Sequence, residues 1–232
     1  MTDWATISSL ATGGGTLVLA VATYGSVRSA NRSARLAEQT LLAGVRPVII
    51  PSREDDPEEH VRFGEGVILA VPGHGAAVKL EHDVVYLAIA LRNGGTGLAV
   101  LHGWQARVQP PRTRESSSRG PLLSEPLRPA ETGVDEAPDS ERFRRQQLDL
   151  YIPAGETGFW QGALRDPEEP GYAEVRRALA EGERSLWIDL LYGDYQGGQR
   201  TIVRMGIAPW PDTEGERAYV LRYFNLDRDD PR

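Results

Sequence analysis

The sequence predicts a mainly β protein: an antiparallel β-sandwich with one short helix, preceded by a long N-terminal helix. Residues 84–92 alternate between large apolar side chains and smaller or polar ones, the pattern of a strand that buries one face. Further runs of this kind are bounded by Gly, Pro and Asn, which favour turns. Because the apolar face of a sheet needs a second layer, we expect strands after residue 145 to supply it.

Length, charge and residue content limit the kinds of protein and of site that this chain can be. The chain has 232 residues, which suits one core with extra segments. Its formal net charge of −7 argues against a nucleic-acid partner, because phosphate binding needs clustered cationic side chains. Without cysteine, the chain has no disulfide, thiolate nucleophile or cysteine metal site. The four histidines are scattered, so we expect no metal and no cofactor.

Residues 4–27 carry no charge and are expected to span the membrane bilayer. A helix rises about 1.5 Å per residue, so this stretch would cross a hydrocarbon core of about 30 Å. Ser8, Ser9 and Gly13-Gly14-Gly15 dilute its first half. Two alternatives stay open. A cleaved signal peptide would fit Ala20-Val21-Ala22, although the start lacks basic residues, and the stretch could also be a buried helix of a soluble protein.

The flanks of residues 4–27 predict the orientation of such a span. Basic residues follow it at Arg28, Arg32, Arg35 and Arg46, and none precedes it. The positive-inside rule therefore places the N-terminus outside and the following domain in the cytoplasm of a single-pass protein.

Residues 28–44 continue as a helical stalk, because they are good helix formers and end at a glycine that precedes Pro47. Small residues four positions apart, Ser9 with Gly13 and Ala11 with Gly15, would allow weak homo-oligomerisation through the membrane helix.

Residues 45–226 are expected to form the β domain, followed by a polar tail at 227–232. The run at 84–92 leads through a glycine-rich turn to a returning strand at 98–108, which predicts a hairpin. On that strand, alternation places Val100, His102, Trp104, Ala106 and Val108 on one face. Other strands are expected at 48–50, 61–63, 67–71, 76–80, 148–152, 158–163, 186–192, 199–207 and 218–224, and a short amphipathic helix at 172–181.

Two polar segments interrupt this domain. Residues 110–142 are rich in proline and serine and poor in large apolar residues, so we expect a flexible insertion. Residues 51–59 are acidic, but they lack the ligand spacing of an EF-hand, and a solvated loop is the simpler interpretation than a calcium site.

Known catalytic motifs are absent: there is no G-x-S-x-G elbow, no H-E-x-x-H pair and no phosphate-binding loop. We therefore expect no catalytic residue. Paired aspartates can do acid–base chemistry, but a lone aspartate in an alternating strand ordinarily faces solvent. A His two residues from a Trp can bind a ligand, but such a pair more often packs at a domain edge. The candidate binding surface consists of His102, Trp104, Trp160, Asp189, Asp194 and Tyr195.

Two segments carry a family resemblance: Gly44-Val45-Arg46-Pro47-Val48, and Leu87 to Gly97 with its Arg-Asn-x-Gly-x-Gly turn. Together with the N-terminal stretch, they resemble uncharacterised single-pass, membrane-anchored proteins of GC-rich bacteria. In those proteins the turn lies in an immunoglobulin-like β domain. The resemblance implies an immunoglobulin-like sandwich here, and it brings no activity, cofactor or catalytic residue.

These observations lead to one functional expectation and one alternative. We expect a membrane-tethered, non-enzymatic interaction module whose β domain presents a strand edge or a loop to a protein partner. The alternative is a domain that binds a small ligand or a carbohydrate through Trp104, Trp160 and Trp187, extracytoplasmic if residues 4–27 are a signal peptide.

Overall fold

The computed structural model describes residues 4–110, 134, 136–148, 151–210 and 215–228. The chain divides into two compact units, residues 1–44 and residues 45–232. Most of the insertion expected at 110–142 lies outside the described residues, and so does the end of the polar tail expected at 227–232. Within the described part of that insertion, Ser140–Arg142 form a short 3-10 helix, η1.

The first unit is one helix, α1 (Trp4–Gly44), which runs unbroken through the stretch expected to be a stalk. The structure does not bear out the membrane span expected over residues 4–27. Among the described residues, no helix contains a segment long and apolar enough to cross a membrane. The reason lies in the first half of the stretch, where Ser, Thr and Gly offset the apolar residues.

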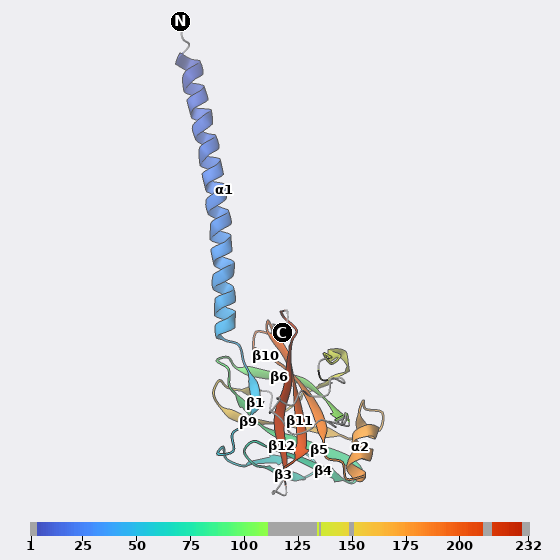
Figure 1. Ribbon diagram of the computed structural model, residues 1–232. Helices are drawn as coiled ribbons and strands as arrows, with labels where there is room; N and C mark the ends of the chain where they lie inside the picture. The colour runs from blue at the N-terminus through green and yellow to red at the C-terminus, as the bar shows by residue number, and fades with distance from the viewer. Residues whose placement is uncertain (1–3, 111–133, 135, 149–150, 211–214, 229–232) are drawn as a thin grey trace, which may run out of the picture. The chain divides into compact units, whose positions relative to one another are not determined.

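The second unit contains one ten-stranded antiparallel sheet and one two-stranded sheet (Figure 1). Every run expected to form a strand overlaps a strand of the structure, and only β7 was not expected. The strands are β1 (Ile49–Pro51), β2 (Glu59–Arg62), β3 (Ile68–Val71), β4 (Gly75–Glu81), β5 (Val84–Asn93), β6 (Ala99–Val108), β7 (Arg144–Arg145), β8 (Tyr151–Ile152), β9 (Thr157–Leu164), β10 (Leu186–Gly193), β11 (Arg200–Pro209) and β12 (Glu216–Asn225).

The ten-stranded sheet has two halves. In one half β5 pairs with β9 on one edge and with β4 and β1 on the other. In the other half the order is β12-β11-β10-β6, with β7 and β8 beside β6. In the part of the chain that the structure describes, only two pairs of the strand register join the halves, and both lie between the start of β4 and the start of β12. The main core lies between them, because apolar side chains of both halves form one buried cluster.

Strand β5 is buried on both faces. As expected, Val85, Leu87, Ile89 and Leu91 lie in the main core and are fully buried. The opposite face, which includes Tyr86, packs in a second cluster under the β2–β3 hairpin, which the sequence also predicted. The domain therefore has a second apolar layer outside its sheet.

The helix expected at 172–181 is confirmed as α2 (Tyr172–Ala180). Tyr172 and Val175 belong to the main core, and Leu179 packs against it. Gly182, which follows the helix, has a φ of +86°, the left-handed conformation in which glycine ends helices.

The hairpin expected over residues 84–108 is wrong. The partners of β5 are β1, β4 and β9, whereas β6 pairs with β7, β8 and β10. Asn93, fully buried, explains the difference. Its Oδ1 accepts hydrogen bonds from the Val48 and Gly95 amides, and its Nδ2 donates to the Gly97 and Ile152 carbonyls. The loop after β5 therefore crosses from one half of the sheet to the other. Its Asn93 also binds Val48, near the start of the β domain.

The face assignment on β6 is also wrong, because the strand contains an irregularity. Opposite β10, Leu191 pairs with Gly103 and Tyr192 pairs with Leu101, so His102 has no partner in the register. Such a bulge shifts the alternation by one residue. Leu101 and Trp104 consequently both point into the main core, although strict alternation would separate them.

Candidate functional site

The tryptophans proposed as ligand-binding residues are buried. Trp104 is 3% exposed and Trp160 is 1% exposed, and their rings pack edge to face with centroids 5.1 Å apart. Trp187 is 4% exposed and lies under the guanidinium groups of Arg107 and Arg204. None of the three offers an open aromatic face on which a sugar could stack.

Asp189 is fully buried, so the expectation that it faces solvent is wrong. It lies opposite Arg204 in the register of β10 and β11, and Arg204 is fully buried too. Arg204 donates to the carboxylate from Nε at 2.7 Å and from Nη2 at 3.2 Å, and Arg107 Nη2 donates at 3.1 Å. Two guanidinium groups thus neutralise the carboxylate, which is the arrangement of a structural ion pair.

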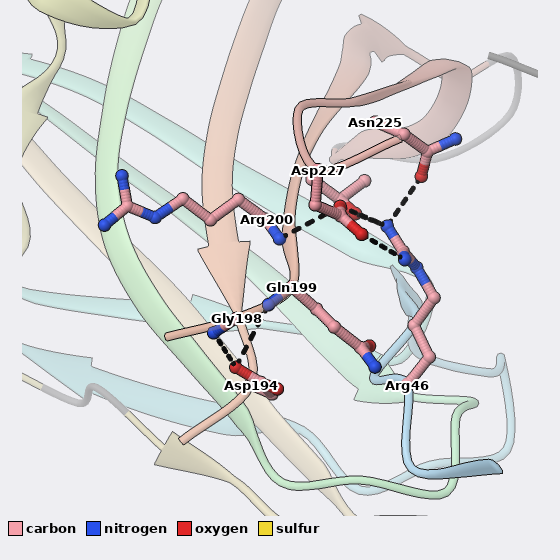
Figure 2. A network of polar contacts seen from close by, with 8 residues as sticks. Arg46, Asp194, Gly198, Gln199, Arg200, Asn225 and Asp227 are labelled. Atoms are coloured by element: carbon pink, nitrogen blue, oxygen red, sulfur yellow. Dashed lines mark hydrogen bonds and ion pairs between the residues drawn. The ribbon is translucent and has the colours of Figure 1, made fainter. Parts of the chain in front are cut away.

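The other proposed residues on this side do not converge on a reaction centre. Asp194 closes the β10–β11 turn, because its Oδ1 accepts from the amides of Gly198 at 2.9 Å and Gln199 at 3.3 Å (Figure 2). Tyr195 is exposed. Burial and the nearby Arg200 lower the pKa of His102 below its ordinary value, against a smaller opposing effect of Asp194. This shift favours the neutral form of the His102 imidazole.

Figure 2 also shows a polar network around Arg46 that the sequence did not predict. Arg46 donates to both oxygens of Asp227 at 2.9 Å, to Asn225 Oδ1 at 2.7 Å and to Thr201 Oγ1 at 2.9 Å. Burial alone would raise the pKa of Asp227, but the hydrogen bonds from Arg46 and from the Arg200 amide outweigh it and lower this pKa. The network ties the first residues of the β domain to β11 and to the end of β12.

An open strand edge gives the domain its most distinctive surface. β9 pairs with β5 along its whole length, and no second strand pairs with β9 in the described part of the chain. Side chains reach its outer carbonyls instead. Arg144 Nη1 donates to the Ala163 carbonyl at 2.5 Å, and Gln146 Nε2 donates to the Gln161 carbonyl at 3.2 Å.

A cavity of about 130 Å³ lies beside this edge. Residues 161–163 of β9, residues 144–148 around β7 and residues 62–64 at the end of β2 line it, together with Trp104 and Arg165. Four of the lining residues are arginines, at positions 62, 144, 145 and 165, and none is acidic. We call this cavity the seam pocket.

The four arginines differ in their partners. Arg144 pairs with Glu169 at 2.7 Å and lies over the ring of Trp104, with 5.0 Å between its Cζ and the ring centroid. Arg165 forms a bidentate pair with Glu65 at 2.6 and 3.1 Å. The hydrogen bond from Arg165 is the main reason that the pKa of Glu65 lies below its ordinary value.

Arg62 and Arg145 have no hydrogen-bond or ion-pair partner among the described residues, and both are exposed. Both residues line the seam pocket, but strand alternation turns the side chain of Arg145 away from those of Arg144 and Gln146, which reach β9. It likewise turns the side chain of Arg62 away from those of the buried Val61 and Phe63. Sequence reasoning missed these arginines, because they come from separate segments that only folding brings together. The described residues also include no group of three or more acidic or histidine side chains that could hold a metal ion.

Comparison with protein-family models, with curated proteins and with solved structures found no match for this chain. The functional argument therefore rests on the geometry of the open edge and of the seam pocket.

Proposed function

We propose that the β domain is a non-enzymatic interaction module that binds an extended segment of a partner protein by strand addition along β9. The observation that carries this proposal is the open edge of β9, whose outer carbonyls are reached by the side chains of Arg144 and Gln146. Strand addition uses such an edge, because main-chain hydrogen bonds supply affinity and side-chain pockets supply specificity.

The direction of the main-chain groups supports the proposal. In an antiparallel strand the N–H and C=O of one residue point to the same side. The carbonyls of Gln161 and Ala163 point away from β5, so their amides do as well, and so does that of Phe159 two residues earlier. An added strand would hydrogen-bond to these groups and replace the two side-chain donors.

Between β7 and β9, side chains make the contacts in place of backbone hydrogen bonds. Neighbouring strands in a sheet hydrogen-bond directly through their backbones, whereas Arg144 and Gln146 reach the carbonyls of β9 with their side chains. The outer main-chain groups of β9 therefore have no strand partner among the described residues, as strand addition requires.

The immunoglobulin-like fold is part of this proposal. In a constant-type immunoglobulin domain, strands A, B, E and D form one sheet and C, F and G the other. The neighbours β1-β5-β9 and β6-β10-β11 match A-B-E and C-F-G in chain order. A buried tryptophan on β6, Trp104, fits the tryptophan of strand C. In this correspondence the open edge of β9 is the place beside strand E that strand D occupies.

A small-ligand or carbohydrate binder is a weaker candidate. Its basis was a set of accessible indole rings, and Trp104, Trp160 and Trp187 are each at most 4% exposed.

Peptide selection with a residue-level readout tests strand addition. A displayed library of twelve-residue peptides would be selected on the full chain, and amide hydrogen exchange would be followed by NMR. In the free chain we expect the Phe159 and Ala163 amides to exchange faster than those of Trp160 and Gly162, which point toward β5. Enriched peptides should protect Phe159 and Ala163. Enriched peptides that leave both amides unprotected, or no enrichment at all, would overturn the proposal.

A proline variant supplies the matched control. Ala163→Pro removes an amide from the open edge without removing a bond to β5, and edge strands tolerate proline there. Ala163→Gly keeps that amide and loses only a methyl group. We expect Ala163→Pro to weaken peptide binding at least tenfold and Ala163→Gly to change it less than threefold. If Ala163→Pro fails to fold, the exchange measurement on the unmodified chain still tests strand addition.

A further inference from the structure

We infer that α1 binds an anionic lipid bilayer. In this interaction the apolar segment, residues 17–27, enters the hydrocarbon layer, and the cationic segment, residues 28–35, lies at the phosphate groups of the lipids. The inference does not depend on strand addition along β9, because it concerns the first of the two compact units of the chain. It gives that unit a partner of stated chemistry, a lipid surface with negative headgroups.

The apolar segment is exposed. Its large apolar side chains keep between 53% and 70% of their surface accessible to water: Leu17, Leu19, Val21, Tyr24 and Val27. Apolar surface is unfavourable in water, and a helix in a protein gains most of its stability from packing such surface against a partner. Because the chain itself leaves these side chains exposed, any cover for them must come from another molecule.

The cationic segment follows directly. Its charged side chains are Arg28, Arg32 and Arg35, and the sequence has no other charged residue between positions 4 and 37. Spacings of four and three residues place the arginines on one face of the helix. All three are exposed, and none has a hydrogen-bond or ion-pair partner among the described residues. Guanidinium groups bind phosphates through charge-assisted hydrogen bonds, so this face matches an anionic lipid surface.

The order of residue types along α1 matches the layers of a bilayer. Residues 17–27 rise about 16 Å, close to one leaflet, which is half of a hydrocarbon core of about 30 Å. Tyr24 lies one turn before Arg28, and aromatic side chains with a polar end favour the level of the headgroups. Insertion into one leaflet does not require that α1 cross the bilayer.

A second copy of α1 fits the cationic face less well. Glu38 is the only acidic residue of α1, so two paired helices could offer only one carboxylate for every three arginines. Pairing through this face in the same direction would also bring like charges together, because Arg28, Arg32 and Arg35 share the face. A bilayer, by contrast, removes apolar surface from water and neutralises the arginines at the same time.

Vesicle flotation of the full chain tests the inference. One set of vesicles consists of phosphatidylcholine, and the other of equal parts of phosphatidylcholine and phosphatidylglycerol. The charge variant is Arg28→Gln/Arg32→Gln/Arg35→Gln, and the apolar variant is Leu19→Gln/Val21→Gln. Glutamine suits both variants, because it favours the helix while it removes charge or apolar surface. Flotation at several lipid concentrations gives an apparent affinity for each protein.

The matched control removes three positive charges from the β domain instead. It is Arg53→Gln/Arg62→Gln/Arg177→Gln, at exposed positions. We expect the unmodified chain to bind the anionic vesicles at least tenfold more tightly than the neutral ones, although its formal net charge is −7. Each α1 variant should weaken this binding at least tenfold, and the control should change it less than threefold. Added salt should also weaken it, because salt screens exposed charges.

Single-cysteine labelling locates the inserted segment without altering the arginines. The chain has no cysteine of its own, so Val21→Cys and Thr40→Cys can each carry one environment-sensitive fluorophore. On anionic vesicles the emission of the label at position 21 should shift to the blue, as it does in an apolar medium. The label at position 40, beyond the arginines, should not shift. This measurement still tests the inference if the charge variant fails to fold.

Three results would overturn the inference. One is a chain that floats with neither kind of vesicle. Another is binding that needs no negative lipid, or that leaves the label at position 21 in water. The third is a dimer in sedimentation velocity that Leu19→Gln/Val21→Gln disrupts, in a chain that binds no vesicle, because a second copy would then cover α1. None of these results changes the protection expected at β9, so strand addition is tested separately.

Discussion

The polar groups of the interior and those of the seam pocket differ in burial and in whether they have partners. Asp189 and Arg204 are fully buried and satisfy each other across two central strands. Asn93 is fully buried, and both the oxygen and the nitrogen of its side-chain amide form hydrogen bonds. In the seam pocket, by contrast, Arg62 and Arg145 remain exposed without a partner among the described residues. The first group holds the fold together, and the second is expected to contribute little to it.

Desolvation explains the difference. A buried charge is tolerated only when it is paired and hydrogen-bonded, because the interior cannot solvate it as water does. An exposed guanidinium keeps its water and needs no partner for the fold to be stable. Exposed arginines without a partner among the described residues are therefore expected to add little to the stability of the fold. The predictions below test that contrast, from the largest expected effect on stability to the smallest.

Removal of the buried carboxylate should have the largest effect. Asp189→Ala leaves the guanidinium of Arg204 buried without its charge partner, which typically costs about 3–5 kcal/mol. Asp189→Asn should be destabilised similarly, because it keeps the shape and removes the charge. Urea unfolding followed by tryptophan fluorescence measures both free energies of unfolding. A loss below about 1 kcal/mol for both variants would mean that the pair is not structurally important.

The buried amide should come second. Asn93→Ala removes four hydrogen bonds at once and leaves the Val48 and Gly95 amides without their acceptor. We expect a loss of about 2–3 kcal/mol in the free energy of unfolding. Asn31→Ala, the same substitution on the exposed surface of α1, should change it by less than about 0.5 kcal/mol. Equal effects of the two substitutions would contradict the role assigned to Asn93.

The half-buried network around Arg46 should have a smaller, pH-dependent effect. Arg46→Gln is expected to cost about 1–2 kcal/mol near neutral pH, because it removes a charged donor from Asp227. The pKa of Asp227 is lowered in the folded state, below a reference value of 3.8. The stabilisation is therefore full well above that reference value and is lost as the pH falls through the folded pKa.

Unfolding curves of the unmodified chain and of Arg46→Gln at several pH values measure this effect. The two free energies of unfolding should differ at neutral pH and converge in acid. Arg53→Gln, at an exposed position, serves as the control and should show no such convergence. A difference between the unmodified chain and Arg46→Gln that stays constant down to acid pH would show that the pairing with Asp227 is not its source.

The seam pocket should give the smallest effect on stability. Arg62→Gln/Arg145→Gln is expected to change the free energy of unfolding by less than about 0.5 kcal/mol, because neither side chain has a partner to lose among the described residues. The same urea titration measures it. A loss above about 1 kcal/mol would show that these arginines support the fold after all, and the contrast between interior and pocket would fail.

Local patterns predicted most elements of the β domain correctly. The alternation in 84–92 identified the strand with the most buried apolar residues, and Gly193 to Gly198 marked the turn between β10 and β11. The helix α2 was recognisable from the spacing of Tyr172 and Val175. Each of these patterns depends on neighbours within a few residues along the chain.

Pairing between distant segments was harder to predict. The glycine-rich turn after β5 suggested a hairpin, but Asn93 and the glycines of that turn hold residues 45–48 instead. One bulge at His102 was enough to change the face of β6 on which Trp104 lies. Arg62 and Arg145 were also missed. The cavity that they line is formed by β2, β7 and β9, and segments so far apart in the sequence leave no local pattern that predicts a cavity.

By itself, the sequence determined where strands and helices form and which side chains of β5 are apolar, since hydrophobic period and turn residues act locally. The tertiary structure alone decided which strands are neighbours, that β9 has no second strand beside it within the described ranges, and that Asp189 is buried against Arg204. The physical reason is that strand pairing and charge burial depend on partners far away along the chain, such as Ala76 beside Glu216 and Arg46 beside Asp227, which a local pattern does not encode.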